Sequence, residues 1–276
     1  MKKKKLSLGI VLLLAVAFTA HTQQYDNERD FEIRLRDGKV IITGYTGTKQ
    51  EIRIPPIIQG KPVTEIGQSA FKNKRISSVV IPDNVIYIRR EAFRNNQLTS
   101  VTIPNSVTII WDNAFSENQL TSVVIPNSVT VIGVEAFRNN RLTSVTIGNN
   151  VTTIEDGAFN NNQLTSVTIP NSVTTIGFDA FNNNRLTSVT IGNTVTNIDA
   201  FAFGVYLPSI IIPDSVTVMD CRVFNGDHLT SITIGSNVEM IIIHNGNRGD
   251  RFAVFYNEQG RRAGTYTYSN NRWSLN

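Results

Sequence analysis

Apolar residues recur along most of this chain at a fixed interval of 22 residues. Phenylalanine marks one position of the repeat and isoleucine marks another. The phenylalanines are Phe71, Phe93, Phe115, Phe137, Phe159, Phe181, Phe203 and Phe224. The isoleucines are Ile81, Ile103, Ile125, Ile147, Ile169, Ile191, Ile212 and Ile234. A period of this length predicts a solenoid in which each repeat forms one coil.

One interval in each series is 21 residues instead of 22. The stretch that both short intervals share runs from Phe203 to Ile212, where three residues, 204–206, separate Phe from Leu and other repeats place four. We therefore predict a single shortened loop at this point.

Each repeat contains two short segments with the character of strands. In one repeat, residues 98–103 and 107–110 alternate apolar with polar side chains and are rich in β-branched residues. Pro104 begins the turn between them, because proline has no N–H to donate to a strand ladder. Later repeats carry glycine there, which we interpret as a need for conformational freedom. These glycines are Gly148, Gly192 and Gly235.

A single coil of this size cannot enclose its own apolar side chains, so the coils must stack on one another. Stacking predicts two parallel strand stacks around a narrow core, with the phenylalanines as an internal column. One asparagine per repeat precedes the leucine, and its amide can bond backbone groups at a tight bend, so we predict a structural role for it. These residues are Asn96, Asn118, Asn140, Asn162 and Asn184.

The repeat motif Leu-Thr-Ser-Val-Thr-Ile-Pro-Asn-Ser-Val-Thr-x-Ile-Gly-x-x-Ala-Phe resembles the BspA-like, treponemal type of leucine-rich repeat. The resemblance covers residues 52–243, and residues 42–47 and 60–67 resemble the opening of that family. It implies a mainly-β solenoid with short turns or helical segments. It also implies an exported or cell-surface protein of a kind often associated with adhesion to host proteins or to other cells.

The ends of a solenoid need covers, because they would otherwise expose the core and unpaired strand edges. Residues 31–43 alternate across Asp37-Gly38, which predicts a hairpin. Residues 250–259 carry aromatic side chains at helical spacing before Gly260, which predicts a short helix. A second hairpin is expected around residues 269–271, flanked by Tyr266, Tyr268 and Trp273, which we interpret as a lid rather than a ligand site.

The N-terminus has the layout of a secretory signal peptide, with four lysines, an apolar run over residues 6–18 and then small and polar residues. The run is too short to span a bilayer comfortably. Cleavage is predicted before Gln23; cleavage after Ala17 and retention as an uncleaved anchor are the alternatives. The predicted organisation is a signal peptide at 1–22, an N-terminal cap at 23–51, the solenoid at 52–243 and a C-terminal cap at 244–276.

The formal charge of +4 comes entirely from this leader. Four of the 26 Lys and Arg residues lie at positions 2–5, and residues 1–22 contain no acid, so 22 charges of each sign remain. A chain that is close to neutral gives no reason to expect a nucleic-acid partner. We predict that the chain has no transmembrane helix once the leader has been cleaved.

The chain has one cysteine, Cys221, so its stability must come from packing rather than from an internal disulfide. A lipid anchor at the cleavage point would also need a cysteine there. Cys221 takes a repeat position that varies widely, which predicts a surface or rim site. The equivalent residues are Arg90, Asp112, Val134, Asp156, Phe178 and Ala200.

Motifs that carry catalysis or bind metal are absent from the sequence. After the leader it has two histidines, His228 and His244, and neither a His-Glu-x-x-His nor a Cys-x-x-Cys arrangement. It contains no Gly-x-Ser-x-Gly elbow and no phosphate-binding glycine loop. Glu155 and Asp156 lie on a variable rim segment and are interpreted as solvated. We therefore predict a protein that is not an enzyme, with no metal and no cofactor.

The outward positions of the first strand of each coil carry hydroxyl side chains, with apolar exceptions at Val80, Val124 and Ile211. Eight strands at a spacing of about 4.8 Å give a face roughly 34 Å long and about 16 Å wide, which exceeds a small-molecule pocket. We predict a binding surface for a macromolecule; the alternative is that Thr and Ser merely suit exposed strands. The predicted binding residues are Thr99, Ser100, Thr102, Thr121, Ser122, Thr143, Ser144, Thr146, Thr165, Ser166, Thr168, Thr187, Ser188 and Thr190.

A second candidate is the tripeptide Arg248, Gly249 and Asp250, which could engage integrins from an exposed loop. The alternatives are a chance match and a role for Asp250 as a helix cap. The leading functional hypothesis is an exported adhesin-like module that binds a protein of the host matrix or of a bacterial surface. The alternative is a periplasmic or envelope protein that acts by self-association.

Overall fold

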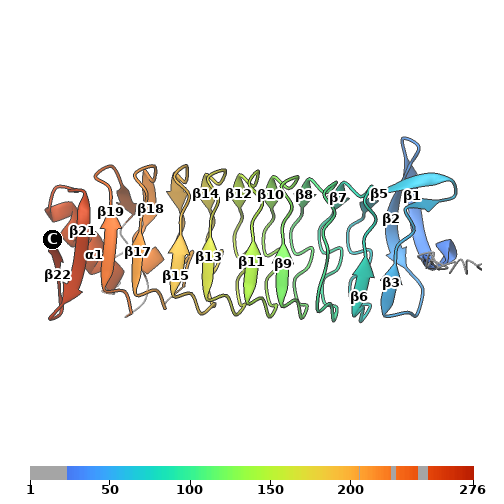
Figure 1. The fold of residues 1–276 in the computed structure, drawn as a ribbon, viewed down its shortest axis with the longest axis horizontal. Coiled ribbons are helices and arrows are strands. Elements are labelled where there is room, and N and C mark those ends of the chain that lie inside the picture. The colour runs from blue at the N-terminus through green and yellow to red at the C-terminus, as the bar shows by residue number, and fades with distance from the viewer. Residues whose placement is uncertain (1–23, 205, 225–227, 242–247) are drawn as a thin grey trace, which may run out of the picture.

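Most coils of the solenoid supply strands to two separate stacks, which run side by side along an elongated molecule (Figure 1). The chain is represented by a computed structural model that describes residues 24–204, 206–224, 228–241 and 248–276. The predicted signal peptide and its cleavage site before Gln23 lie outside the described residues. Among the residues described, no helix is long and apolar enough to cross a membrane.

The second strand of each coil belongs to a continuous 12-stranded sheet, here called the second sheet. Its coil strands are parallel and in register, so that Ile88, Ile110 and Ile132 form one inward row. The coil strands are β5 (Lys61–Ile66), β7 (Tyr87–Ile88), β8 (Ile109–Ile110), β10 (Val131–Ile132), β12 (Thr153–Ile154), β14 (Thr175–Ile176), β16 (Asn197–Ile198), β18 (Val218–Asp220) and β20 (Glu239–Ile241). Strand β4 (Ile57–Ile58) pairs antiparallel with β5.

The first strands of the coils form the first sheet, which is divided into short parallel sets. The paired strands are β3 (Glu51–Arg53) with β6 (Ser78–Val80), β9 (Ser122–Val124) with β11 (Ser144–Thr146), β13 (Ser166–Thr168) with β15 (Ser188–Thr190), and β17 (Ser209–Ile211) with β19 (Ser231–Ile234). Central strands have three residues, fewer than predicted, and residues 98–103 contain no assigned strand.

Three of these pairs join a coil with proline after its first strand to a following coil with glycine. A Cβ atom on Gly148 would lie 2.4 Å from the Pro126 carbonyl oxygen, and one on Gly192 would lie 2.5 Å from that of Pro170. The predicted need for conformational freedom was wrong, because neither glycine has positive φ. Glycine is required there because it lets successive backbones approach closely enough to bond, as in the 2.9 Å bond from the Ile125 N–H to the Thr146 carbonyl.

The predicted phenylalanine column is confirmed. Rings from Phe71 to Phe181 are fully buried, stack with centroids 5.0–5.4 Å apart and lie within 9° of parallel. The next spacing, from Phe181 to Phe203, widens to 6.2 Å just before the shortened loop. The side chain of Phe224 lies outside the described part of the structure.

The asparagine ladder is also confirmed as structural. The Asn140 amide donates to the Phe115 and Phe137 carbonyls at 3.0 and 3.1 Å, and its oxygen accepts the Leu120 N–H at 3.0 Å. Each ladder asparagine is 4–8% exposed and binds two coils in the same way. The ladder therefore satisfies backbone groups that the bend would otherwise leave buried and unpaired.

The N-terminal cap is the predicted hairpin of β1 (Phe31–Arg36) and β2 (Lys39–Tyr45), preceded by the 3-10 turn η1 (Glu28–Asp30). Strand β2 pairs parallel with β5, so the hairpin extends the second sheet. Tyr45 continues the aromatic column, with its ring 5.7 Å from that of Phe71. The cap thus covers the first coil with strand pairing and with aromatic packing.

The C-terminal cap is the predicted helix and hairpin, α1 (Arg248–Glu258), β21 (Gly264–Ser269) and β22 (Arg272–Leu275). Strand β21 pairs antiparallel with β19 and closes that end of the first sheet. Phe252, Tyr256 and Tyr266 are fully buried, and the Tyr256 hydroxyl donates to the Gly235 carbonyl. Burial raises the pKa of Tyr256 above its usual value.

The predicted surface position of Cys221 was wrong. Cys221 begins the 3-10 turn η2 (Cys221–Phe224) and is fully buried, with its Sγ 3.0 Å from Asp250 Oδ1. Equivalent residues such as Asp156 and Phe178 are exposed. The difference arises because α1 packs against η2 and covers the same repeat position in this coil.

Candidate functional site

The fourteen predicted Thr and Ser positions are all exposed, and we call this set the hydroxyl face. Strands β9, β11, β13 and β15 carry its central part (Figure 1). Alternation along each strand turns the Val or Ile between the hydroxyl residues toward the core. Val123 and Val167, for example, are 3% and 4% exposed. The alternation in the sequence therefore determines which side chains are exposed to a partner.

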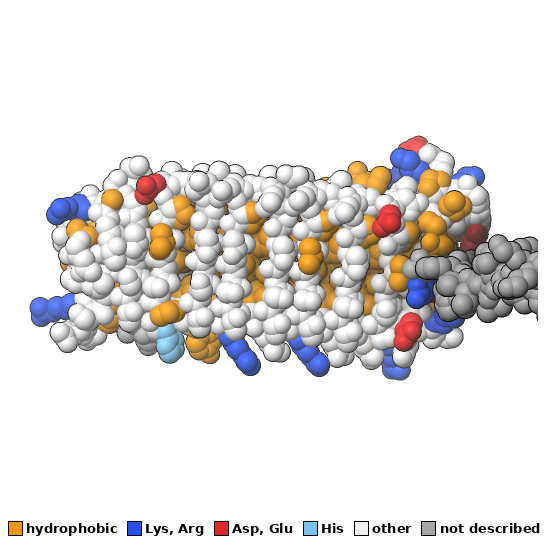
Figure 2. Space-filling view, in the orientation of Figure 1, with side chains coloured by type: hydrophobic (Ala, Val, Ile, Leu, Met, Phe, Trp, Pro, Cys, Tyr) orange, Lys and Arg blue, Asp and Glu red, His pale blue; other side chains and the backbone are white. Residues whose placement is uncertain are grey.

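Charged side chains are sparse in the middle of this view and gather at the two ends and along one edge (Figure 2). Arg141 and Arg185, which directly precede the buried leucines of their coils, are exposed. Val124 and Ile211 project from the face with 63% and 67% of their surface accessible. The hydroxyl face is thus neutral, with isolated apolar side chains and cations at its margin.

The exposed hydroxyls fall into two groups. Thr143 and Thr187 donate to the carbonyls of Thr121 and Thr165 in the preceding coil, at 3.2 and 3.3 Å. Within the described chain, the hydroxyls of Ser122, Ser144 and Ser166 form no hydrogen bond. Thr143 and Thr187 therefore help to hold the coils together. The three serines keep their full hydrogen-bonding capacity for water or for a partner.

A second threonine ladder, which the sequence did not single out, lies beside the second sheet. Thr130 and Thr152 donate their hydroxyls to the Thr108 and Thr130 carbonyls at 3.3 and 3.2 Å. The same bond recurs at Thr108, Thr174, Thr196 and Thr217. Its sequence signal was the recurrence of threonine directly after the inward valine of the turn.

Arg248, Gly249 and Asp250 lie in the first turn of α1 rather than in an exposed loop. Asp250 is 3% exposed, and its Oδ1 accepts from Cys221 Sγ. An integrin-type motif needs an accessible carboxylate, so this geometry gives the motif no support. The buried carboxylate instead links the C-terminal helix to the last coils.

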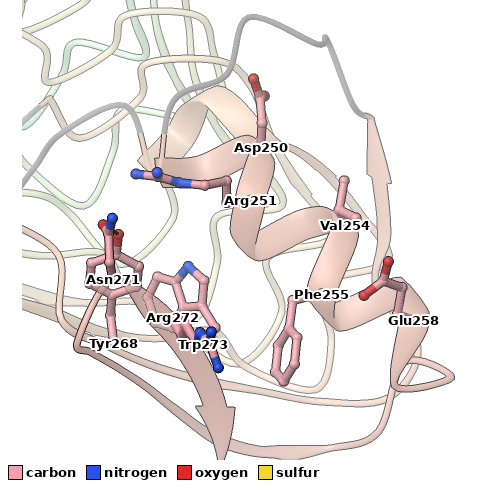
Figure 3. Close-up of a pocket in the computed structure, with 9 residues that line it drawn as sticks. All are labelled: Asp250, Arg251, Val254, Phe255, Glu258, Tyr268, Asn271, Arg272 and Trp273. Atoms are coloured by element: carbon pink, nitrogen blue, oxygen red, sulfur yellow. Dashed lines mark hydrogen bonds between the residues drawn. The ribbon is translucent and has the colours of Figure 1, made fainter.

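A cavity of about 490 Å³ lies between α1 and β22 in the C-terminal cap (Figure 3). Val254 and Phe255 line its helical side, and Trp273 lines the side of the hairpin. Trp273 is 7% exposed and packs on Phe252 at 5.0 Å, and its buried Nε1 has no hydrogen-bond partner among the described residues. Because Trp273 and Tyr266 are buried against the core, the aromatic group acts mainly as a lid on the solenoid.

Of the two rim carboxylates predicted to be solvated, Asp156 is exposed and Glu155 is partly buried. Burial raises the pKa of Glu155, with smaller contributions from the charges of Asp156 and Asp112. Asp156 uses its Oδ1 to accept the Phe178 N–H at 2.8 Å, which links two coils. Among the described residues, no three His, Cys, Asp or Glu side chains are grouped to hold a metal ion.

The architecture defines the class of this protein as a leucine-rich-repeat solenoid. Six copies of the BspA type leucine rich repeat region match residues 64–185 and 131–244, and the chain belongs to this family. No curated protein matches the chain.

Solved structures share the fold. A leucine-rich repeat protein from Bacteroides ovatus has 23% identity and a TM-score of 0.57 over 76% of this chain, which spans 65% of that protein. The T. pallidum leucine-rich repeat protein has 28% identity and a TM-score of 0.57 over 66% of this chain and 86% of its own. The pneumococcal vaccine antigen PcpA has 19% identity and a TM-score of 0.53 over 76% of this chain and 69% of its own.

Proposed function

We propose that this chain is an exported protein-binding module that contacts its partner through the hydroxyl face. The observation that carries the proposal is the run of exposed Ser and Thr side chains on β9, β11, β13 and β15, whose serine hydroxyls form no hydrogen bond within the described part of the chain. A surface of repeated, nearly identical strands suits a large or repetitive protein better than a small molecule. The role is binding rather than catalysis, as is usual for solenoids with extended surfaces.

Export and adhesion form the finer part of the proposal. Export rests on the predicted signal peptide at 1–22, and adhesion rests on the implication of the family resemblance. The ligand is then a protein of the host matrix or of a bacterial surface. The alternative, a periplasmic protein that associates with itself, would use the same solenoid without a host ligand.

Binding is tested with two matched triple variants of the purified protein. The first, Ser122→Arg, Ser144→Glu and Ser166→Arg, places alternating charges across the hydroxyl face. The control, Val131→Arg, Thr153→Glu and Thr175→Arg, places the same charges on adjacent strands of the second sheet. Opposite charges on neighbouring strands limit repulsion in both. A panel of immobilised matrix proteins should lose binding to the first variant and keep binding to the control.

Localisation separates adhesion from the periplasmic alternative. Protease treatment of intact cells followed by mass spectrometry should release peptides of this chain if it is displayed on the surface. Recovery of the chain undigested from intact cells, and its digestion only after the envelope is opened, would instead support the periplasmic role.

A further inference from the structure

The outer surface of the second sheet differs from the hydroxyl face at its N-terminal end. There a cavity of about 620 Å³ opens between the N-terminal hairpin and the first coils. We call it the arginine cleft and define it by six of its lining residues, Arg34, Arg36, Glu65, Arg89, Arg90 and Trp111. Its volume is in the range of sites that hold a drug-sized ligand or a few peptide residues.

Arg89 is held rigidly at the centre of the cleft. Its Nε and Nη2 donate to the two oxygens of Glu65 at 2.9 and 3.1 Å. Its guanidinium carbon lies 4.7 Å from the centroid of the Tyr87 ring and 5.1 Å from that of Trp111. A guanidinium fixed by a carboxylate and by two aromatic rings loses little freedom when it binds a ligand.

Glu65 organises the cationic wall. It is 7% exposed, and besides Arg89 it accepts a bond from Arg36 Nη2 at 2.9 Å. Its pairing in register with Ile41 and Tyr87 places it on the outward row of the sheet, under the arginines. One buried carboxylate thus orients two guanidinium groups and neutralises only one of their charges.

The remaining charge of the cleft is positive. Four arginines, at 34, 36, 89 and 90, face two carboxylates, Glu65 and Asp112. Among the described residues, Arg34 and Arg90 form no ion pair. The planar fork of arginine pairs best with a carboxylate or another oxyanion.

An apolar wall adjoins the charges. Trp111 is 36% exposed, and Ile109 lies two residues before it on the same outward row. In the next coil the position of Trp111 is taken by Gly133, where a Cβ atom would lie 2.8 Å from the Trp111 backbone carbon. With no side chain at Gly133, space is left beside the indole.

We propose that the arginine cleft binds an acidic peptide segment, with carboxylates on Arg34 and Arg90 and an apolar side chain against Trp111. This site lies on a different sheet from the hydroxyl face, and the inference goes beyond the proposed function. The cleft supplies the charge, shape and individual side chains that the repetitive hydroxyl face lacks.

The test uses fluorescence anisotropy with a labelled synthetic peptide, Glu-Glu-Phe-Glu-Glu, and its Gln-Gln-Phe-Gln-Gln counterpart. Saturable binding of the acidic peptide is expected, and Arg34→Ala with Arg90→Ala should weaken it about tenfold, since two solvent-exposed ion pairs are lost. Both arginines are exposed, so the fold should remain intact. Arg141→Ala with Arg185→Ala removes the same charge at the margin of the hydroxyl face and should leave binding unchanged.

Trp111→Ala should weaken binding of the phenylalanine peptide more than binding of a Glu-Glu-Ala-Glu-Glu peptide. Three outcomes overturn the proposal: no saturable binding of the acidic peptide, equal loss in the two double variants, and equal binding of the glutamine peptide. Binding of a heparin hexasaccharide without binding of the peptide would also overturn it, because the ligand class would then be a sulfated sugar.

Discussion

The interior of the central coils and the hydroxyl face come from the same coils, yet their side chains obey different constraints. Inside, Phe137 stacks 5.4 Å from the rings on either side, and Asn140 bonds backbone groups of two coils. Outside, the hydroxyl of Ser144 on β11 forms no hydrogen bond with another coil in the part of the structure described.

This contrast teaches where function can be sought in a repeat protein. A residue that recurs because its side chain bonds the neighbouring coil is explained by folding and gives no information on ligands. A residue that recurs without such a bond is available to a partner. Thr143 and Ser144 are neighbours in sequence but lie on opposite sides of this division, because the Thr143 hydroxyl bonds the Thr121 carbonyl.

The largest effect on stability is expected from a substitution in the phenylalanine column. Phe137→Ala should lower the free energy of unfolding by about 3–5 kcal/mol, because it leaves a cavity between two stacked rings. Urea denaturation followed by circular dichroism measures the change. An unfolding midpoint equal to that of the parent would show that the column contributes little to stability.

The asparagine ladder should give the next largest effect. Asn140→Ala removes the partner of two buried carbonyls and one N–H, and should cost about 2–3 kcal/mol. Asn161→Gly is the control, since Asn161 is exposed, has φ of 55° and bonds only the Asn139 side chain through its own side chain among the described groups. Similar losses in both variants would mean that the buried ladder has no special role.

A smaller, pH-dependent effect is expected at the rim. A hydrogen bond from Lys72, and further bonds from Arg94 and Ser69, lower the pKa of Glu91 from 4.5 to about 2. Because the pKa is lower in the folded state, the stabilisation is complete above pH 4.5 and is lost as the pH falls toward 2.

Glu91→Gln should therefore destabilise the protein by on the order of 1–2 kcal/mol at neutral pH, since partial exposure of its partners screens the interaction. The difference from the parent, measured in urea from pH 7 to pH 2, should shrink in the acid range. Glu258→Gln, at an exposed position, is the control. A difference that does not change with pH would contradict this role.

The smallest effects on stability are expected from substitutions on the hydroxyl face, where threonine and serine should differ. Thr143→Val removes one bond between coils and should cost about 0.5–1 kcal/mol, whereas Ser144→Ala should leave stability within about 0.5 kcal/mol of the parent. Thermal unfolding of both variants makes the comparison. Equal destabilisation would show that the serine ladder is structural too.

The repeat made most of the fold predictable. Period and residue type were enough to place the Phe column, the asparagine ladder, the two strand stacks and both caps, because stacking leaves a coil few alternatives. Cys221 was misplaced since its burial comes from α1, an element distant in sequence. Gly148 was misinterpreted because its requirement is a contact with Pro126 in the preceding coil.

The candidate sites were predictable only in part. The hydroxyl face follows from strand alternation, and every predicted residue is exposed. The arginine cleft was missed because Arg34 and Arg89 come from different elements, the hairpin and a coil, which only the pairing of β2 with β5 brings together. A sequence signal did exist, in the aromatic and arginine residues that replace small side chains in the first repeats.

The most direct test of the central claim is a binding isotherm of the two matched triple variants against a matrix protein that the parent binds. We expect Ser122→Arg, Ser144→Glu and Ser166→Arg together to abolish saturable binding, while the triple variant of Val131, Thr153 and Thr175 keeps the affinity of the parent. Undiminished binding by the first variant, or failure of the folded parent to bind any protein of the panel, would contradict it.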